Sequence, residues 1–148
     1  MKKQVVINMN EIKEEIALAL DNLKTAYTPY SHHDVSAVLV SKSGKKYTGI
    51  NIENAAFSPT ICAERTAFAK AISEGEKEFY RIVIIGGLNG EVDDYCPPCG
   101  VCRQVMMEFC EPESFDIVLA KNIYDYKIFK LKDVLPMGFG PANLRCEG

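Results

Sequence analysis

The stretch Arg81 to Gly86, R-I-V-I-I-G, places four consecutive apolar residues in the middle of the chain. A short continuous apolar run that ends at a glycine is typical of a strand buried on both faces at the centre of a sheet. A helix pattern precedes this strand and another follows it, and further strand patterns lie beyond both. This alternation of strand and helix predicts parallel pairing through right-handed crossovers.

Strand patterns lie on both sides of this central run. The segments Val35–Val40 (V-S-A-V-L-V) and Lys46–Ile52 (K-Y-T-G-I-N-I) are joined by a short turn that contains Gly44. Two β-rich runs with such a connection predict a hairpin. Toward the C-terminus, Phe115–Ala120 and Tyr126–Phe129 predict two more strands. The expected sheet therefore has about five strands.

Three segments carry helix patterns. An amphipathic helix is expected from Asn10, its cap, to a point before Pro29, because apolar residues recur there every three or four positions: Ile12, Ile16, Leu20, Leu23 and Tyr27. A second helix is expected over Ile61–Ser73, with an alanine-rich face (Ala63, Ala67, Ala69 and Ala71) and a left-handed end at Gly75. A third is expected over Cys99–Cys110. The predicted fold is α/β, a three-layer α/β/α arrangement with a mixed sheet, in one domain spanning residues 1–148.

Composition restricts the function without selecting it. The chain has 148 residues, 47% of them hydrophobic and 25% charged, with a net charge of −3. The absence of a basic surplus argues against a nucleic-acid partner. The first ten residues lack the features of a signal peptide, and no segment is apolar over the length of a bilayer, so no membrane partner and a cytoplasmic location are expected. The six cysteines are then expected as reduced thiols or metal ligands.

Two short segments carry the residues expected to do chemistry. One is T-I-C-A-E-R-T-A-F (Thr60–Phe68), which contains Cys62, and the other is P-P-C-G-V-C-R-Q (Pro97–Gln104), which contains Cys99 and Cys102. Three thiolates on zinc leave a fourth tetrahedral position open for water, as in catalytic zinc sites. Glu64, two residues after Cys62, is expected as a general base beside that position rather than as a ligand.

The surroundings of these cysteines affect the charge of the site. Both segments are expected at loop-to-helix junctions, where unpaired backbone N–H groups favour thiolates. Three thiolates on one zinc carry a net negative charge, which Arg65 and Arg103 would offset as neighbours of the ligands. The main alternative is a closed structural zinc site that also uses Cys96. Two prolines separate Cys96 from Cys99, so Cys96 is expected to be a spectator thiol.

These motifs resemble those of a known family. The pair C-A-E and P-C-G-V-C matches the three-cysteine form of the zinc nucleobase deaminase signature. The segments Tyr47–Thr66, P-C-G-V-C-R-Q-V-M-M-E-F and F-G-P-A-N-L resemble the small homotetrameric cytidine deaminases, over residues 28 to 144. The resemblance implies a zinc enzyme of pyrimidine salvage that deaminates free cytidine and 2′-deoxycytidine, with active sites at the subunit interfaces of a homotetramer.

The resemblance also assigns roles to individual residues. Glu64 would carry protons while activated water attacks C4 of cytosine and ammonia leaves. Asn51 and Glu53, from N-I-E-N, would bind the ribose hydroxyls, and the backbone N–H of Ala63 would contact the pyrimidine edge. Phe139 would lie against the substrate of a neighbouring subunit. Without the resemblance, Asn51 and Glu53 would be interpreted as polar residues ending an edge strand, and Phe139 as a core residue.

One segment departs from the family pattern. The chain has P-Y-S-H-H-D-V-S-A (29–37) where the family usually has P-Y-S-x-F-x-V-G-A. His33 therefore occupies the position of the phenylalanine that packs beside the base, and Ser36 occupies that of a glycine. A histidine can stack on a base but is polar and titratable, which leaves the preference among cytidine, deoxycytidine and modified pyrimidines open.

Three other functions remain as alternatives. Deaminases of modified aminonucleosides such as blasticidin S resemble this scaffold but generally lack the acidic residue of N-I-E, so Glu53 argues against that substrate. Editing of polynucleotides would need a basic groove that binds the strand. A non-catalytic structural zinc module would need a fourth protein ligand, for which Cys96 is the candidate.

Overall fold

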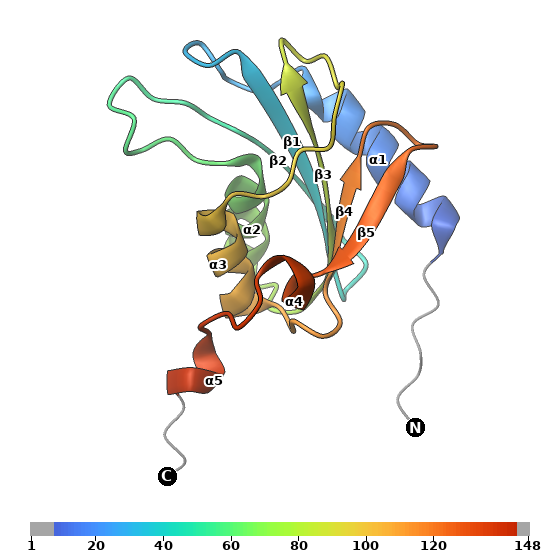
Figure 1. Cartoon of the computed structure of the whole chain (residues 1–148), viewed down its shortest axis with the longest axis vertical. Coiled ribbons are helices and arrows are strands. Elements are labelled where there is room, and N and C mark those ends of the chain that lie inside the picture. The colour runs from blue at the N-terminus through green and yellow to red at the C-terminus, as the bar shows by residue number, and fades with distance from the viewer. Residues whose placement is uncertain (1–7, 145–148) are drawn as a thin grey trace.

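The protein is built on one five-stranded mixed sheet with the strand order β2-β1-β3-β4-β5. The structure is a computed structural model that describes residues 8–144 (Figure 1). Its elements, in chain order, are α1 (Met9–Leu23), β1 (His33–Ser41), β2 (Lys46–Ile50), α2 (Ala63–Ser73), β3 (Phe79–Leu88), α3 (Gly100–Phe109), β4 (Asp116–Ala120), β5 (Tyr126–Lys130), α4 (Leu131–Val134) and α5 (Pro141–Leu144).

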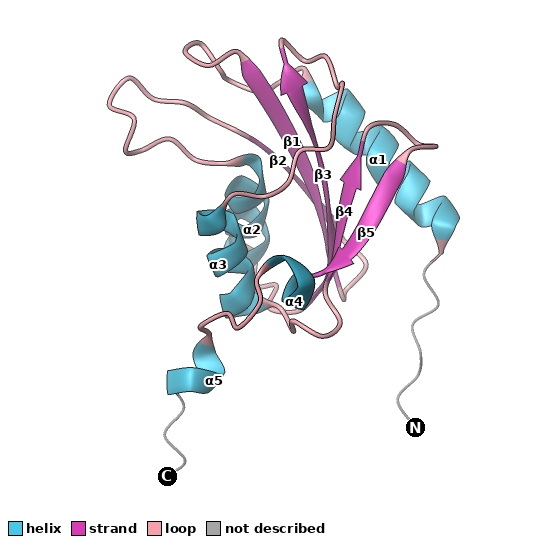
Figure 2. Cartoon of the chain, in the orientation of Figure 1, coloured by secondary structure: helices cyan, strands magenta, loops and turns pink. Residues whose placement is uncertain are grey.

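The sheet is mixed because one pair of neighbouring strands is parallel and the other three pairs are antiparallel. The predicted central strand, β3, pairs with β4 in parallel and with β1 in antiparallel orientation. β1 is also antiparallel to β2, and β5 is antiparallel to β4. The prediction of parallel pairing is thus correct for β3 and β4 and wrong for the other edge of β3 (Figure 2). β1 takes that interior place because it too is buried on both faces, from Ser36 to Ser41.

Helices cover both faces of the sheet, as the three-layer prediction requires (Figure 1). On one face, Ile12, Ile16 and Ala19 of α1 pack on alternate residues of the strands, among them Val38 and Val83. On the other face, α2 and α3 pack on the intervening residues, including Leu39, Ile82, Ile84 and Ile117. The period of two along each strand therefore divides the apolar residues between two cores.

Two details of the helices differ from the predictions. The cap of α1 is Asn8, whose side chain accepts a hydrogen bond of 3.0 Å from the backbone N of Asn10, so Asn10 lies inside the helix. α1 ends at Leu23, and Tyr27 lies beyond it in an isolated bridge with Ile52. On α2, Ala69 is exposed whereas the other three alanines of the predicted face are buried.

Close packing of α2 on β2 depends on one glycine. A Cβ at Gly49 would lie 2.2 Å from the carbonyl oxygen of Ala63 and 2.6 Å from the backbone N of Ala67. No other residue allows this approach, which brings the start of α2 directly over the sheet. α2 ends before Gly75, whose φ of 96° confirms the predicted left-handed end.

Some predictions fall outside the described residues. Most of the N-terminal segment considered for a targeting signal lies there, as do Cys146 and both ends of the predicted domain, because residues 1–7 and 145–148 are not described. Within residues 8–144, no helix has the length and apolar character to span a membrane.

Candidate active site

The three predicted zinc ligands lie at the N-termini of two helices. Cys62 is the N-cap of α2 and Cys99 is the N-cap of α3, while Cys102 lies in the first turn of α3. Neither N-cap side chain makes a capping hydrogen bond. The unpaired N–H groups and positive dipole ends of both helices therefore stabilise negative charge at these sulfurs.

The sulfurs are spaced as zinc requires. Sγ of Cys99 lies 3.7 Å from Sγ of Cys62 and 3.5 Å from Sγ of Cys102, and all three sulfurs lie within 4.8 Å of one another. A tetrahedral zinc with Zn–S bonds of about 2.3 Å separates its sulfurs by about 3.8 Å. The group therefore fits zinc with its three thiolates on one side of the ion.

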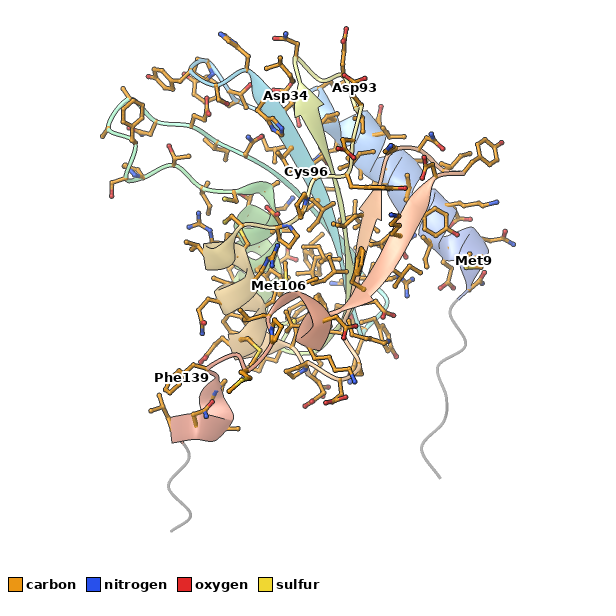
Figure 3. The ribbon with its side chains drawn as sticks, viewed as in Figure 1. Met9, Asp34, Asp93, Cys96, Met106 and Phe139 are labelled. Atoms are coloured by element: carbon orange, nitrogen blue, oxygen red, sulfur yellow. The ribbon has the colours of Figure 1, made fainter. Side chains whose placement is uncertain are left out.

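The sulfur of Cys96 lies outside this group, although its side chain lies nearby between the sheet and the two helices (Figure 3). A Cβ at Gly86 would lie 3.0 Å from Sγ of Cys96, so this glycine makes room for the thiol on the sheet. Burial raises the pKa of Cys96 to about 11, and the charges of Glu64 and Cys62 add to the effect. The position of its sulfur outside the group of three argues against the closed four-cysteine site.

Protons in the group are shared between Cys62 and Cys102. Hydrogen bonds from Cys102 and from Arg65 together lower the pKa of Cys62 to about 5. The hydrogen bond between the two thiols, together with burial, raises the pKa of Cys102. The first thiol of the pair therefore ionises readily, and removal of the second proton needs an additional positive charge such as a metal ion.

The two arginines next to the ligands have different partners. Nη2 of Arg65 donates to Sγ of Cys62 at 3.4 Å, as expected for a residue that offsets thiolate charge. Arg103 instead donates to two carbonyl oxygens, that of Pro98 at 2.8 Å and that of Val134 at 2.6 Å. Among residues 8–144 it makes no hydrogen bond to a thiolate. Its contacts connect the cysteine-bearing loop to the end of α4.

Glu64 is buried beside the cysteine group. Its side chain is buried in the first turn of α2, 4% exposed, and Oε2 lies 3.7 Å from Sγ of Cys102. Burial raises the pKa of Glu64 to about 7, and the negative charge at Cys62 adds to the increase. A carboxyl group with this pKa can both accept and donate a proton near neutral pH.

Asn51 is held in one orientation by the backbone of β1. Its Oδ1 accepts a hydrogen bond of 2.9 Å from the backbone N of Val35, and its Nδ2 donates one of 2.8 Å to the carbonyl oxygen of His33. One amide hydrogen of Asn51 remains for another acceptor. The sequence does not predict Val35, whose side chain packs against the core that α2 and α3 share with the sheet, as part of the site.

Glu53 is kept ionised by the backbone before β1. Its Oε1 accepts hydrogen bonds of 3.1 Å from the backbone N of both Tyr30 and Ser31. Hydrogen bonds from Ser31 and Tyr30 lower the pKa of Glu53. A pocket of about 410 Å³ lies against the same carboxylate, lined by Tyr30, Ser31, Glu53, Phe57 and Thr60. No sequence signal identified Tyr30 and Ser31, because they act through their backbone N–H groups.

The remaining predicted residues lie in different surroundings. Ala63 is the first residue of α2 and is buried, with a backbone N–H among those that have no partner within the helix. His33 is exposed at the start of β1. Phe139 is 57% exposed and is held by a hydrogen bond of 2.8 Å from Gln104 to its carbonyl oxygen. In Figure 3, Phe139 lies far from Cys96.

Comparison with known proteins agrees with this geometry. Residues 9–115 match the sequence profile of the cytidine and deoxycytidylate deaminase zinc-binding region. A cytidine deaminase of Sporosarcina psychrophila is 38% identical over 134 residues, which cover 90% of this chain and 95% of that protein. A probable cytidine deaminase of Dictyostelium discoideum is 42% identical over 115 residues, which cover 78% of this chain and 74% of that protein.

Solved structures give the same result. The crystal structure of cytidine deaminase from Burkholderia pseudomallei superposes with a TM-score of 0.76 at 38% identity, covering 85% of this chain and 97% of that one. The corresponding enzyme of Mycobacterium tuberculosis gives a TM-score of 0.73 at 30% identity, covering 91% of this chain and 99% of that one. With its three-cysteine group at two helix N-termini, the chain belongs to the cytidine and deoxycytidylate deaminase family.

Proposed function

We propose that this chain catalyses the hydrolytic deamination of free cytidine and 2′-deoxycytidine to uridine and 2′-deoxyuridine, with release of ammonia. The observation that carries the proposal is a buried carboxyl group, Glu64, with a pKa raised to about 7, next to three cysteines spaced for zinc. The names of the relatives and of the structural neighbours support the same substrate class.

Cys62, Cys99 and Cys102 would hold zinc, which supplies Lewis acidity that lowers the pKa of water. Glu64 accepts a proton from this water at Oε1 or Oε2 and later donates one to the leaving amino group. Its burial excludes bulk water that would compete for these protons. Arg65 stabilises the thiolate of Cys62 throughout.

Asn51 and Glu53 would bind the sugar. The free amide hydrogen of Asn51 donates to a ribose hydroxyl, and the ionised Glu53 accepts from one. Both groups are oriented before substrate binds, because backbone groups of β1 and of the preceding turn hold them. Preorganised groups of this kind lower the entropy lost on binding. The N–H of Ala63 would contact the pyrimidine edge, and His33 would pack beside the base.

The charges around the sugar site favour a nucleoside over a nucleotide. The pocket next to Glu53 is lined by aromatic, hydroxyl and carboxylate side chains and by no lysine or arginine of the described residues. A phosphate group would meet the ionised carboxylate without a compensating cation.

The direct test follows cytidine absorbance in the ultraviolet with purified, zinc-loaded protein. The proposal predicts loss of cytidine and 2′-deoxycytidine with the wild type, no loss with Glu64→Gln, and no reaction of cytidine 5′-phosphate. An inactive wild-type protein that retains zinc would contradict the proposal. Preferential turnover of blasticidin S in a competition assay would reassign the substrate.

The active assembly in this proposal is a homotetramer in which Phe139 contacts the substrate of a neighbour. Phe139, Met137 and Leu144 are all exposed on the C-terminal segment, where they have little contact with their own chain. Light scattering measures the assembly. Mixing inactive Glu64→Gln subunits with inactive Phe139→Ala subunits tests the shared site, because mixed tetramers contain some sites with both residues intact and should regain activity.

We also propose a role in pyrimidine salvage and a cytoplasmic location, since the cysteine group requires reduced thiols and reducing compartments preserve them. Fractionation of cells followed by immunoblotting tests the location. Enrichment in a secreted or membrane fraction would contradict it.

A further inference from the structure

Of the three cysteines of the predicted zinc site, Cys99 is the least buried. Cys102 is buried and Cys62 is half-buried, but Cys99 is exposed. Cys99 ends the segment of residues 89–99 between β3 and α3, here called the metal loop, which contains no helix or strand. Its sulfur must nevertheless stay within 3.7 Å of the sulfurs of Cys62 and Cys102. A loop of this length needs contacts that limit its conformations.

The backbone groups at both ends of the metal loop make hydrogen bonds. At the start, the backbone N of Asn89 donates to the carbonyl oxygen of His32 at 2.6 Å. At the end, Arg103 donates to the carbonyl oxygen of Pro98 at 2.8 Å. Between them, Tyr95 makes the side-chain contacts that connect the loop to a distant part of the chain.

Tyr95 contacts three charged residues of the β4–β5 region. Its hydroxyl group donates a hydrogen bond to Oδ1 of Asp125. Nζ of Lys121 lies 4.8 Å from the centre of its ring, and Nζ of Lys127 lies 5.0 Å from it. Both distances are typical of cation–π contacts. The ring also packs against the core that α2 and α3 share with the sheet.

The β4–β5 turn is a suitable anchor because it is itself ordered. The backbone N of Lys121 donates to the carbonyl oxygen of Asp125 at 2.9 Å, and the backbone N of Asp125 donates to the side chain of Asn122 at 2.9 Å. β4 pairs directly with β3, the strand from which the metal loop begins. The contacts of Tyr95 therefore fix the loop to the sheet a few residues before Cys99.

We propose that Tyr95, together with Asp125, Lys121 and Lys127, positions the metal loop so that Cys99 stays beside Cys62 and Cys102, and thereby slows the loss of zinc. Tyr95 is a positioning residue, since it acts through the backbone that leads to Cys99. The proposal rests on the zinc site of the proposed function. Loss of outer contacts that orient a metal ligand commonly weakens metal binding by about 10-fold to 100-fold.

The experiment measures the rate at which zinc-loaded protein releases zinc to a chromogenic chelator. We expect about 10-fold faster release from Tyr95→Leu and a smaller acceleration from Asp125→Ala and from Tyr95→Phe. The double variant Tyr95→Phe with Asp125→Ala should release zinc no faster than the faster single variant, because both changes remove the same hydrogen bond. Asp125 is exposed, so Asp125→Ala keeps the test informative if Tyr95→Leu fails to fold.

The matched control is Tyr124→Leu in the same turn. Tyr124 is 83% exposed, and its ring lies 5.5 Å from Nζ of Lys13, so it too has a lysine partner. Wild-type release rates in Tyr95→Leu and Asp125→Ala, or equal acceleration in Tyr124→Leu, would overturn the proposal. A wild-type protein that does not retain zinc at all would instead overturn the zinc site of the proposed function.

Discussion

Replacement of Glu64 by glutamine should abolish deamination and stabilise the metal-free protein at alkaline pH. Burial raises the pKa of Glu64 from 4.5 to about 7 in the folded chain. The folded chain therefore binds more protons than the unfolded chain between these two values. The free energy of unfolding then falls as pH rises through this window, and the loss is complete above pH 7.

The change in the free energy of unfolding follows from the change in the pKa of Glu64. A rise of the pKa from 4.5 to about 7 corresponds to about 3 kcal/mol of stability lost on ionisation of the buried carboxyl group. Glutamine has nearly the same shape and does not ionise. Without metal, Glu64→Gln should therefore match the wild type at about pH 4.5 and exceed its free energy of unfolding by about 3 kcal/mol at about pH 8, or about 6 to 12 °C in Tm.

Urea denaturation in the presence of a chelator, at fixed protein concentration and at both pH values, measures this difference. Glu113→Gln is the matched control, because the side chain of Glu113 is 70% exposed beside Lys132. Its effect should be small and nearly independent of pH. The reasoning would be refuted if Glu64→Gln changed stability equally at both pH values, or if it were less stable than the wild type at pH 8.

Three further predictions concern other contacts. Arg65→Gln removes a cation from the thiolate group and should accelerate zinc release about 10-fold, measured with the chelator assay. Glu15→Ala leaves Arg81, which binds it at 2.5 and 2.7 Å, buried without its main partner, and should cost about 3 to 5 kcal/mol in urea denaturation. Asn51→Asp removes the amide donor and should lower kcat/KM about 10-fold or more with little change in zinc content.

The sequence predicts those parts of the fold whose pattern lies within a single segment, and it does not predict contacts between distant segments. Apolar periodicity located the long helix and the strands, because burial of one face imposes a period within a single segment. The pairing of β1 with β3 carries no such signal. Both strands are apolar runs buried on two faces, so their sequences do not show which strand pairs with which side of β3. That pairing depends on contacts between segments that lie far apart in the chain.

In the candidate site, too, residues within one segment are predictable from the sequence, whereas contacts between distant segments are not. Local spacing predicts Cys62 with Glu64 and Cys99 with Cys102, because each pair lies within one turn at the start of one helix. The contact of Tyr95 with Asp125 spans 30 positions and leaves no local pattern. The backbone N–H groups that hold Glu53 cannot be predicted from residue type, because every residue except proline has one.

The direction of the strands explains why the two halves of the site meet. β2 leads into α2, and β3 leads into α3. β1 is antiparallel to both β2 and β3, so these two strands run in the same direction and their C-terminal ends lie at the same edge of the sheet. Both helices therefore begin at that end of the strands, with Cys62 and Cys99 as their N-caps. The insertion of β1 between parallel strands, which local patterns did not predict, thus preserves the convergence of helix N-termini on which the three-thiolate site depends.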